Sequence, residues 1–186
     1  FKHKIIFYTF NLNITKGFSI GEKKQSSHIT ISTYYRLFLS EILPLNINKV
    51  LYLDSDIIVR HSLIDLFKTD FNMAIAAITD CDEGSLDKYN RLRYSQKYGH
   101  FNAGVLYINL LYFREHKILQ KCIDFANQYT NRIISHDQDI LNFVLCDNRY
   151  KLPIKYNLQD GFLFQQKNVS WEYEKEIEEA LSDPFI

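Results

Sequence analysis

The chain has 186 residues with 22 basic and 22 acidic side chains, so its formal net charge is zero and bulk charge gives no attraction to nucleic acid. Phe and Tyr are abundant while Gly and Pro are scarce, which excludes disordered and collagen-like chains and predicts one packed domain. No apolar run approaches the roughly 20 residues of a membrane helix. The three cysteines match neither a zinc spacing nor a disulfide framework, so we expect a cytoplasmic protein.

Apolar periodicity predicts strands that alternate with helices along the chain. Short runs of β-branched and aromatic residues predict strands, and apolar residues three and four positions apart predict helices. The expected strands are 5–10, 50–53, 73–78, 101–109 and 151–154. The expected helices are 32–43, 86–98, 118–129, 137–145 and 171–181. This alternation predicts an α/β fold in which helices flank a mostly parallel central sheet.

Two carboxylates follow a short, wholly apolar run. Residues 50–53 have the composition of a strand buried on both faces, and Asp54 and Asp56 come directly after it. Ligands of open α/β sheets bind beyond the carboxyl ends of the strands. Two facing aspartates repel each other unless a cation lies between them, and hard oxygen ligands favour Mg²⁺ or Mn²⁺. We therefore favour a metal site over the alternative, in which both aspartates only hydrate a turn.

A second class of enzyme also places an Asp-x-Asp pair after a strand. Haloacid-dehalogenase-like phosphatases use one aspartate as the nucleophile and the other as an acid–base group. They normally carry this pair near the start of the chain, with Thr or Ser soon after it. Here Ile57, Ile58 and Val59 follow the pair, so the phosphatase interpretation is the weaker one.

Four segments of the chain, taken in order, resemble one enzyme family. They are Ile-Ser-Thr-Tyr-Tyr-Arg-Leu at 31–37, Lys-Val-Leu-Tyr-Leu-Asp-Ser-Asp at 49–56, Phe-Asn-Ala-Gly-Val-Leu-Tyr-Ile-Asn at 101–109 and Asp-Gln-Asp-Ile-Leu-Asn at 137–142. The chain from about 28 to 157 thereby resembles glycosyltransferase family 8, the retaining enzymes that include glycogenin and bacterial lipopolysaccharide galactosyl- and glucosyltransferases. The resemblance implies a Rossmann-like nucleotide-sugar transferase fold of the GT-A type. It implies that residues 1–186 are a single catalytic domain truncated at both ends, with a histidine as third metal ligand in a segment after residue 186.

The resemblance implies a donor site around the carboxylate pair. Asp54 and Asp56 would hold Mn²⁺, or alternatively Mg²⁺, bridging the diphosphate of a UDP-sugar. Arg36 would reach the donor sugar or the diphosphate, unless it is only a surface charge on an amphipathic helix. The nucleoside side of the donor would be lined by three residues of the second segment, namely Tyr52, Leu53 and Ser55.

Two further segments would surround the reacting sugar. By resemblance, Asn102 and the backbone of Ala103 would hold sugar hydroxyls, although an asparagine here could also just stabilise its own turn. Asp137 and Gln138 would be the catalytic residues. Asp137 would accept hydrogen bonds from the sugar, and the carbonyl of Gln138 would face the charge that develops at the anomeric carbon. The alternative is an Asp137 that caps a helix and an exposed Gln138.

The acceptor side is the least defined part of the resemblance. His28, Asp80 and Asn157 fall where acceptor contacts occur in bacterial relatives. The implied function is retaining transfer of galactose or glucose from a UDP-sugar to a glycan such as lipopolysaccharide core. A protein that builds membrane-linked glycans would work in the cytoplasm at the inner face of the membrane. The alternative of another class is a non-catalytic sugar-nucleotide-binding protein.

Overall fold

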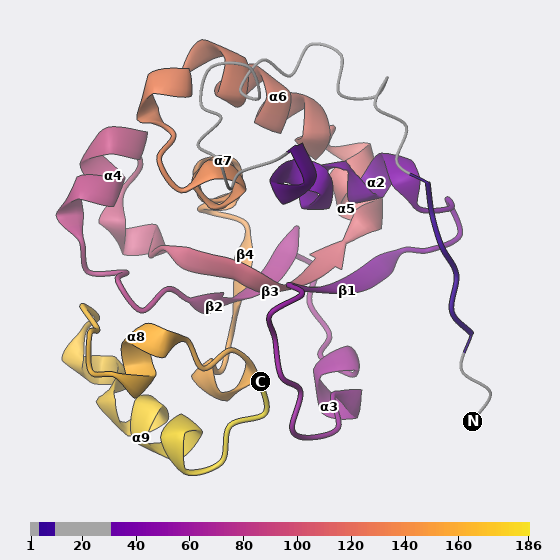
Figure 1. Cartoon of the computed structure of the whole chain (residues 1–186). Coiled ribbons are helices and arrows are strands. Elements are labelled where there is room, and N and C mark those ends of the chain that lie inside the picture. The colour runs from indigo at the N-terminus through magenta and orange to yellow at the C-terminus, as the bar shows by residue number, and fades with distance from the viewer. Residues whose placement is uncertain (1–3, 10–30) are drawn as a thin grey trace.

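A four-stranded sheet forms the centre of the computed structural model, which describes residues 4–9 and 31–186 (Figure 1). The strands are β1 (Lys49–Leu53), β2 (Ile75–Thr79), β3 (Phe101–Asn109) and β4 (Arg149–Leu152), and their order in space is β1-β3-β2-β4. His28 lies outside the described residues, so its contact with an acceptor stays a prediction. Within the described ranges, no helix has the length and apolarity needed to cross a membrane.

The strand directions bring several strand ends to one edge of the sheet. β3 lies between β1 and β2 and is antiparallel to both, whereas β2 and β4 pair in parallel. β1, β2 and β4 therefore run in one direction, and their carboxyl ends meet beside the amino end of β3. The α/β class is confirmed. The expectation of a mostly parallel sheet is correct in that β1, β2 and β4 share one direction. It is wrong for the pairing, because β3 lies between β1 and β2 and is antiparallel to both. A buried strand has the same composition in either direction, so the sequence does not show this.

Helices cover both faces of the sheet (Figure 1). One face carries α2 (Leu39–Ile42), α5 (Leu110–Glu115), α6 (Ile118–Gln128) and α7 (His136–Leu145). The other carries α3 (Ile64–Phe67), α8 (Asp160–Leu163) and α9 (Glu174–Ser182). α4 (Leu86–Leu92) lies between β2 and β3 in the chain. The 3₁₀ helices are η2 (Ile31–Phe38), η3 (Gln96–Tyr98), η4 (Thr130–Arg132), η5 (Ile154–Tyr156) and η6 (Trp171–Tyr173).

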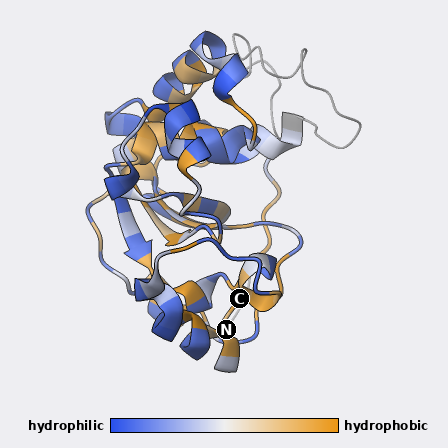
Figure 2. Cartoon of the chain, turned by 90° about the vertical axis from the view of Figure 1, so that its left-hand side faces the viewer, coloured by the Kyte–Doolittle hydropathy of each residue, from blue (hydrophilic) through white to orange (hydrophobic). Residues whose placement is uncertain are grey.

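Each face of the sheet has its own apolar core. Leu106 and Ile108 of β3 pack into the core on the α6 and α7 side, whereas Val105 and Tyr107 pack into the core on the α9 side. This alternation is the period of two that a strand imposes on its side chains. The helices carry hydrophobic and hydrophilic residues on the same element (Figure 2), as expected of amphipathic helices that cover a sheet. Packing against two opposed cores fixes the position of the sheet. It therefore also fixes the edge of the sheet at which the strands end.

The structure departs from the predicted elements in three places. The helix expected at 86–98 ends at Leu92, because Arg93 has a left-handed backbone conformation, and the short 3₁₀ helix η3 follows it separately. The strand expected at 5–10 is wrong, because residues 4–9 form no strand and Ile5 and Phe7 are 81% and 92% exposed. β-branched and aromatic residues form a strand only where a neighbouring strand accepts their backbone hydrogen bonds. The helix expected at 32–43 is a 3₁₀ helix through η2 and becomes an α-helix only in α2. The strand expected at 101–109 is confirmed as β3 with the same bounds.

Candidate functional site

Backbone pairing at the sheet edge fixes the start of the site. Asp54 follows β1, and its N–H donates to the carbonyl oxygen of Gly104 at 2.9 Å. Asp80 follows β2, and its N–H donates to the carbonyl oxygen of His100 at 3.0 Å. Both bonds continue the pairing of β1 and β2 with the amino end of β3. Two acidic side chains are thus held on either side of β3, beyond the strand ends where α/β proteins bind their ligands.

A cleft of about 610 Å³ opens at this edge. Its walls include five of the residues predicted from the sequence, namely Asp54, Asp56, Asp80, Asn102 and Asn157. Residues near α8 and at the end of the chain complete the lining, among them Gln159, Asp160 and Ile186. This volume lies within the range of pockets that bind small molecules and cofactors. Residues from widely separated segments therefore converge on one cavity.

Arg36 is the cation at the centre of the site. Its Nη2 donates to Oδ1 of Asp54 at 2.8 Å, and its Nε lies 2.7 Å from Oδ2 of Asp137. Nη1 donates to the carbonyl oxygen of Ala103, and the guanidinium lies over the ring of Tyr52, 4.5 Å from its centroid. The side chain is only 9% exposed. The alternative of a surface charge is therefore wrong, and Arg36 bridges two carboxylates that come from β1 and α7.

Asp54 is held in place but keeps access to the cleft. Its Oδ1 also accepts a hydrogen bond from the hydroxyl of Tyr52 at 2.7 Å, and its side chain is 30% exposed. Burial of Tyr52, followed by its hydrogen bond to Asp54, raises the pKa of that phenol, so the hydroxyl stays a donor. Leu53 is partly buried in the core on the α9 side, and Ser55 is exposed. Among the predicted donor residues of this segment, Tyr52 thus acts by orienting Asp54.

The donor set at the predicted metal site fits a hard divalent cation only in part. Asp54 and Asp56 line the same cleft, and Asp56 is exposed. In the described part of the chain, no group of three or more His, Cys, Asp or Glu side chains is arranged to hold a metal ion. Two carboxylates can serve Mg²⁺ or Mn²⁺ when phosphate oxygens and water supply the other positions. The chemistry of the two aspartates is compatible with a metal that a diphosphate helps to hold.

Asp137 is a buried carboxylate with an unusual affinity for protons. The residue is 4% exposed and lies in the first turn of α7. Burial raises its pKa to about 6, even though the positive charge of Arg36 opposes this shift, and the negative charge of Asp54 adds to it. The ion pair with Arg36 therefore compensates only part of the cost of burial. Perturbed groups of this kind cluster at functional sites.

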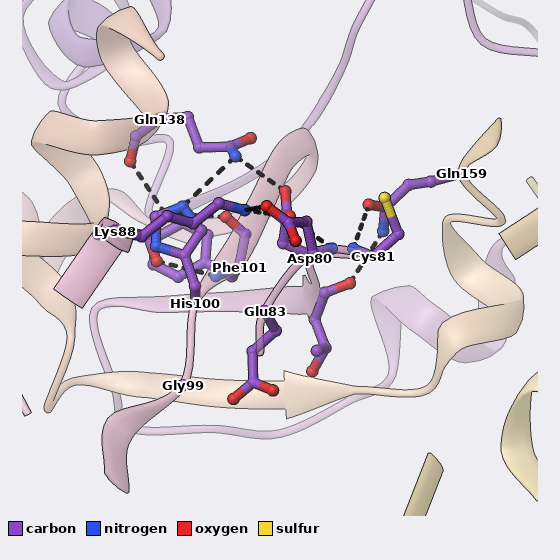
Figure 3. A network of polar contacts seen from close by, with 12 residues as sticks. Asp80, Cys81, Glu83, Lys88, Gly99, His100, Phe101, Gln138 and Gln159 are labelled. Carbon is purple, nitrogen blue, oxygen red and sulfur yellow. Dashed lines mark hydrogen bonds and ion pairs between the residues drawn. The ribbon is translucent and has the colours of Figure 1, made fainter. Parts of the chain in front are cut away.

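The side chain of Gln138 is fixed by contacts at both ends. Its Oε1 accepts a hydrogen bond from the N–H of Ala103 at 2.9 Å, and its Nε2 donates to Oδ2 of Asp80 at 2.9 Å. The alternative of an exposed Gln138 is wrong, because the side chain is half-buried and bonded to two elements. The amide carbonyl predicted to face the sugar is shared with the backbone of β3. Figure 3 shows Gln138 reaching from α7 toward Asp80.

Asn102 makes the turn contact that its sequence context allowed, whereas its contact with sugar hydroxyls stays a prediction. Its Oδ1 accepts a hydrogen bond from the N–H of Gly104 at 2.8 Å, as a turn asparagine does, and another from Nδ2 of Asn157 at 2.9 Å. A side chain at position 104 would begin 3.0 Å from Oδ1 of Asn102 and 3.3 Å from Oδ2 of Asp54. Glycine here lets these groups approach one another. Two of the predicted sugar and acceptor residues are thereby joined at the cleft.

Three side chains that contact the predicted site residues or the cleft wall escaped the analysis of the sequence. Gln159 donates to the carbonyl oxygen of Thr79 and accepts from the N–H of Cys81, both at 2.9 Å, and so fixes the cleft wall after β2 (Figure 3). Lys88 and His100 contact Asp80 and Gln138 in the same network. Gln159 stands in no recognisable pattern. His100 could have been found, because it immediately precedes a strong strand signal.

Comparison with known proteins agrees with this geometry. Residues 1–182 match the family described as glycosyl transferase family 8. The chain is 29% identical over 150 residues to General stress protein A of Bacillus subtilis (strain 168), covering 78% of this chain and 52% of that protein. It is 31% identical over 126 residues to lipopolysaccharide 1,2-glucosyltransferase of Escherichia coli (strain K12), covering 67% of this chain and 37% of that protein.

A solved structure shares the fold. The galactosyltransferase LgtC in complex with donor and acceptor sugar analogues superposes with a TM-score of 0.77 and 28% sequence identity, over 92% of this chain and 62% of that one. The chain thus spans less than two thirds of each of these three proteins. The GT-A type of fold is confirmed by this likeness. Because the family match extends over almost the whole sequence, the chain belongs to glycosyltransferase family 8.

Proposed function

We propose that the protein containing this chain transfers a hexose, glucose or galactose, from a UDP-sugar to a glycan acceptor such as lipopolysaccharide core, with retention at the anomeric carbon. Membership of family 8 supports glycosyl transfer. One relative is named as a lipopolysaccharide glucosyltransferase and another, in Salmonella typhimurium, as a lipopolysaccharide galactosyltransferase. These names support the two candidate sugars and the class of acceptor.

The single observation that carries the proposal is the bridge made by Arg36. One guanidinium contacts Asp54, which follows β1 and lines the cleft, at 2.8 Å and Asp137 at the start of α7 at 2.7 Å. This arrangement can hold the diphosphate end of a donor near Asp54 and its sugar near Asp137 at a fixed separation. Holding reactants in one geometry lowers the barrier because their entropy is lost on binding and not during reaction.

A divalent metal would be held by Asp54 and Asp56. When bound, Mn²⁺ or Mg²⁺ neutralises the charge that develops on a diphosphate leaving group. The remaining roles belong to side chains of the chain itself. Asp56, which is exposed, can adjust to a ligand, whereas Asp54 is oriented by Arg36 and by the hydroxyl of Tyr52.

The two side chains proposed to lie near the donor sugar, Asp137 and Gln138, favour a front-face reaction over a covalent intermediate. Asp137 is buried against Arg36 and suits hydrogen bonding to sugar hydroxyls. The side-chain amide of Gln138 already makes hydrogen bonds to Ala103 and Asp80. An amide is a poor nucleophile, and Gln138 would instead provide a dipole at the anomeric carbon. With no carboxylate assigned as nucleophile, the acceptor hydroxyl would attack on the face that the diphosphate leaves, and a donor phosphate oxygen would take its proton.

A donor screen of the full-length protein tests the proposal. We expect release of UDP from UDP-glucose or UDP-galactose with Mn²⁺ and a lipopolysaccharide-core acceptor. Asp54→Asn should lower kcat/KM by at least about 100-fold, whereas the matched control Asp65→Asn, on the exposed surface of α3, should behave as wild type. Phosphate release from an aryl phosphate would instead indicate the phosphatase. Tight donor binding without turnover would indicate a sugar-nucleotide-binding protein.

A further inference from the structure

Asp80 lines the cleft and is the centre of a polar network (Figure 3). Its Oδ1 accepts hydrogen bonds from Nζ of Lys88 at 2.7 Å and from the N–H of Asp82 at 2.9 Å. Its Oδ2 accepts from Nε2 of Gln138 at 2.9 Å. The residue is 6% exposed. Both oxygens of this buried carboxylate are therefore engaged by protein donors, and one of those donors is the side chain predicted to lie at the anomeric carbon.

His100 supports the same orientation of the Gln138 amide. The imidazole is fully buried, and burial lowers its pKa to about 4, so it is neutral at pH 7. Its Nε2 lies 3.5 Å from Nε2 of Gln138, and its Nδ1 lies 2.7 Å from the hydroxyl of Tyr94. That hydroxyl is also within 3.4 Å of the carbonyl oxygen of Gly99. A single tautomer satisfies the whole chain, with His100 accepting at Nε2 and donating at Nδ1.

Lys88 supplies the charge that this network needs. Burial opposes ionisation of Asp80, but Lys88, the N–H of Asp82 and the neighbouring His100 outweigh it, so the pKa of Asp80 lies below its ordinary value. Lys88 extends from α4, its side chain is 14% exposed, and it is absent from the lining of the cleft. It also lies 3.2 Å from the carboxylate of Asp82. Its contacts are thus with the network and not with the ligand space.

We propose that Lys88 is a positioning residue for sugar transfer, acting through Asp80 to hold the Gln138 carboxamide in its catalytic orientation. This inference rests on the proposed function. The ammonium keeps Asp80 ionised as an acceptor-only group, and an acceptor-only Oδ2 dictates that the NH₂ end of Gln138 points toward it. The carbonyl end is then directed to the side of Ala103 and the sugar. Without the cation, a protonated Asp80 could donate, and the amide could rotate.

The test compares Lys88→Met and Lys88→Arg in the full-length protein. Lys88→Met should lower kcat for UDP release about 10-fold while the KM for the donor changes less than about 3-fold, because orientation and not binding is lost. Lys88→Arg restores a cation beside Asp80 and should recover most of the rate. The matched control is Lys68→Met, which removes the cation of an exposed pair with Asp65 at 3.1 Å and should leave both constants unchanged.

A second measurement follows the amide directly. In protein labelled with ¹⁵N-glutamine, the side-chain signals of Gln138 are identified by their loss in Gln138→Glu. Lys88→Met should shift these signals and make them titrate with pH as the pKa of Asp80 rises. The other titratable groups facing Asp80 are Asp82, Cys81 and His100. Lys88→Arg should return the Gln138 signals to their wild-type chemical shifts. If Lys88 were only a structural contact, restoring a positive charge at position 88 would not be expected to return them.

The outcomes separate the two proposals. An active wild type in which Lys88→Met keeps its kcat, or in which the Gln138 signals do not move, overturns the positioning role alone. A wild type that releases no UDP from any sugar nucleotide overturns the proposed function and the role of Lys88 with it. Should Lys88→Met fail to fold, Lys88→Met combined with Asp80→Asn removes the buried charge together with its partner. That double variant should fold and show the same loss of kcat, and a wild-type rate in it counts against the inference.

Discussion

Asp137 and Asp139 lie two positions apart in the first turn of α7, yet their surroundings differ. Oδ2 of Asp139 accepts hydrogen bonds from Nη1 of Arg91 at 2.7 Å and from the N–H groups of Ile134 and Ser135 at 2.7 and 2.8 Å. Oδ2 of Asp137 lies 2.7 Å from Nε of Arg36 but has no well-formed hydrogen-bond partner among the described residues. Both side chains are buried, so the difference lies in how completely each charge is compensated.

Helix geometry explains why neighbours in one motif have separate tasks. Residues two positions apart on an α-helix point about 200° away from each other. Asp139 points to the loop before α7 and ties it to α4 through Arg91, whereas Asp137 points to Arg36, which also contacts Asp54 at the cleft. A buried carboxylate with a full set of donors holds the fold. One with an incomplete set keeps an acceptor for a ligand, which here would be a sugar hydroxyl.

The largest effect is expected on the structural side of this comparison. Arg91→Met leaves the carboxylate of Asp139, which is fully buried, without its cation, and should lower the free energy of unfolding by about 3–5 kcal/mol. Urea unfolding of the full-length protein measures this loss. The control is Arg93→Met in the same turn, where the side chain is exposed and the change should stay within about 0.5 kcal/mol. A loss below about 1 kcal/mol for Arg91→Met would refute a structural role for this pair.

The second-largest effect is expected on the catalytic activity of variants at Arg36. Arg36→Met removes the cation between Asp54 and Asp137 and should lower kcat/KM for UDP release by about 100- to 1000-fold. Arg36→Lys should restore little, because one ammonium cannot reproduce the fork of a guanidinium between two carboxylates. Unfolding should be less affected than in Arg91→Met, since Asp137 can take up a proton. Arg93→Met is again the control, and activity within about 3-fold of wild type in Arg36→Met would contradict the bridge.

The sequence predicts the regular parts of the fold well and the pairing of its strands poorly. β3 is recognisable to its bounds because nine residues combine strand composition with a Gly-containing entry. Its place between β1 and β2 is not recognisable, because apolar composition carries no information on direction. Residues 5–10 show the same limit of composition, because they have the composition of a strand and yet residues 4–9 form none. Composition reports a tendency to pair, but a partner decides the outcome.

The site could be predicted where a motif is local and not where contacts are long-range. Asp54 and Asp56 come directly after an apolar run, so their position beyond the end of a strand was evident from the sequence. The expected burial of that strand on both faces is wrong, because β1 is an outer strand of the sheet and all five of its residues are only partly buried. Gln159 is 78 positions from Cys81 in the sequence, and no motif connects the two residues. Lys88 is only eight positions from Asp80, but they are joined by a turn and by α4, and no spacing in the sequence marks them as a pair. The distinction between Asp137 and Asp139 was also hidden. It depends on which arginine each one meets, and that follows only from the packing of α4 and η2 against α7.

The smallest effect is a pH dependence that reports the incomplete compensation of Asp137. Burial raises its pKa to about 6, so between about pH 4 and pH 6 the folded state binds a proton that the unfolded state has released. The free energy of unfolding therefore falls as pH rises through this window. At about 1.4 kcal/mol per pKa unit, the cost of ionising this group in the folded protein approaches ~3 kcal/mol above pH 7.

Asp137→Asn removes the ionisation and keeps the shape of the side chain. Relative to wild type, the variant should gain stability as pH rises from 4 to 7 and show a constant difference above that, measured by urea unfolding at each pH. Asp139→Asn is the contrast, because its carboxylate accepts three hydrogen bonds through Oδ2 and the variant should be less stable than wild type at pH 7. The contrary result is that the free energies of unfolding of wild type and Asp137→Asn run parallel from pH 4 to 7. The charge of Asp137 would then be as well compensated as that of Asp139, and the distinction between the two residues of α7 would not hold.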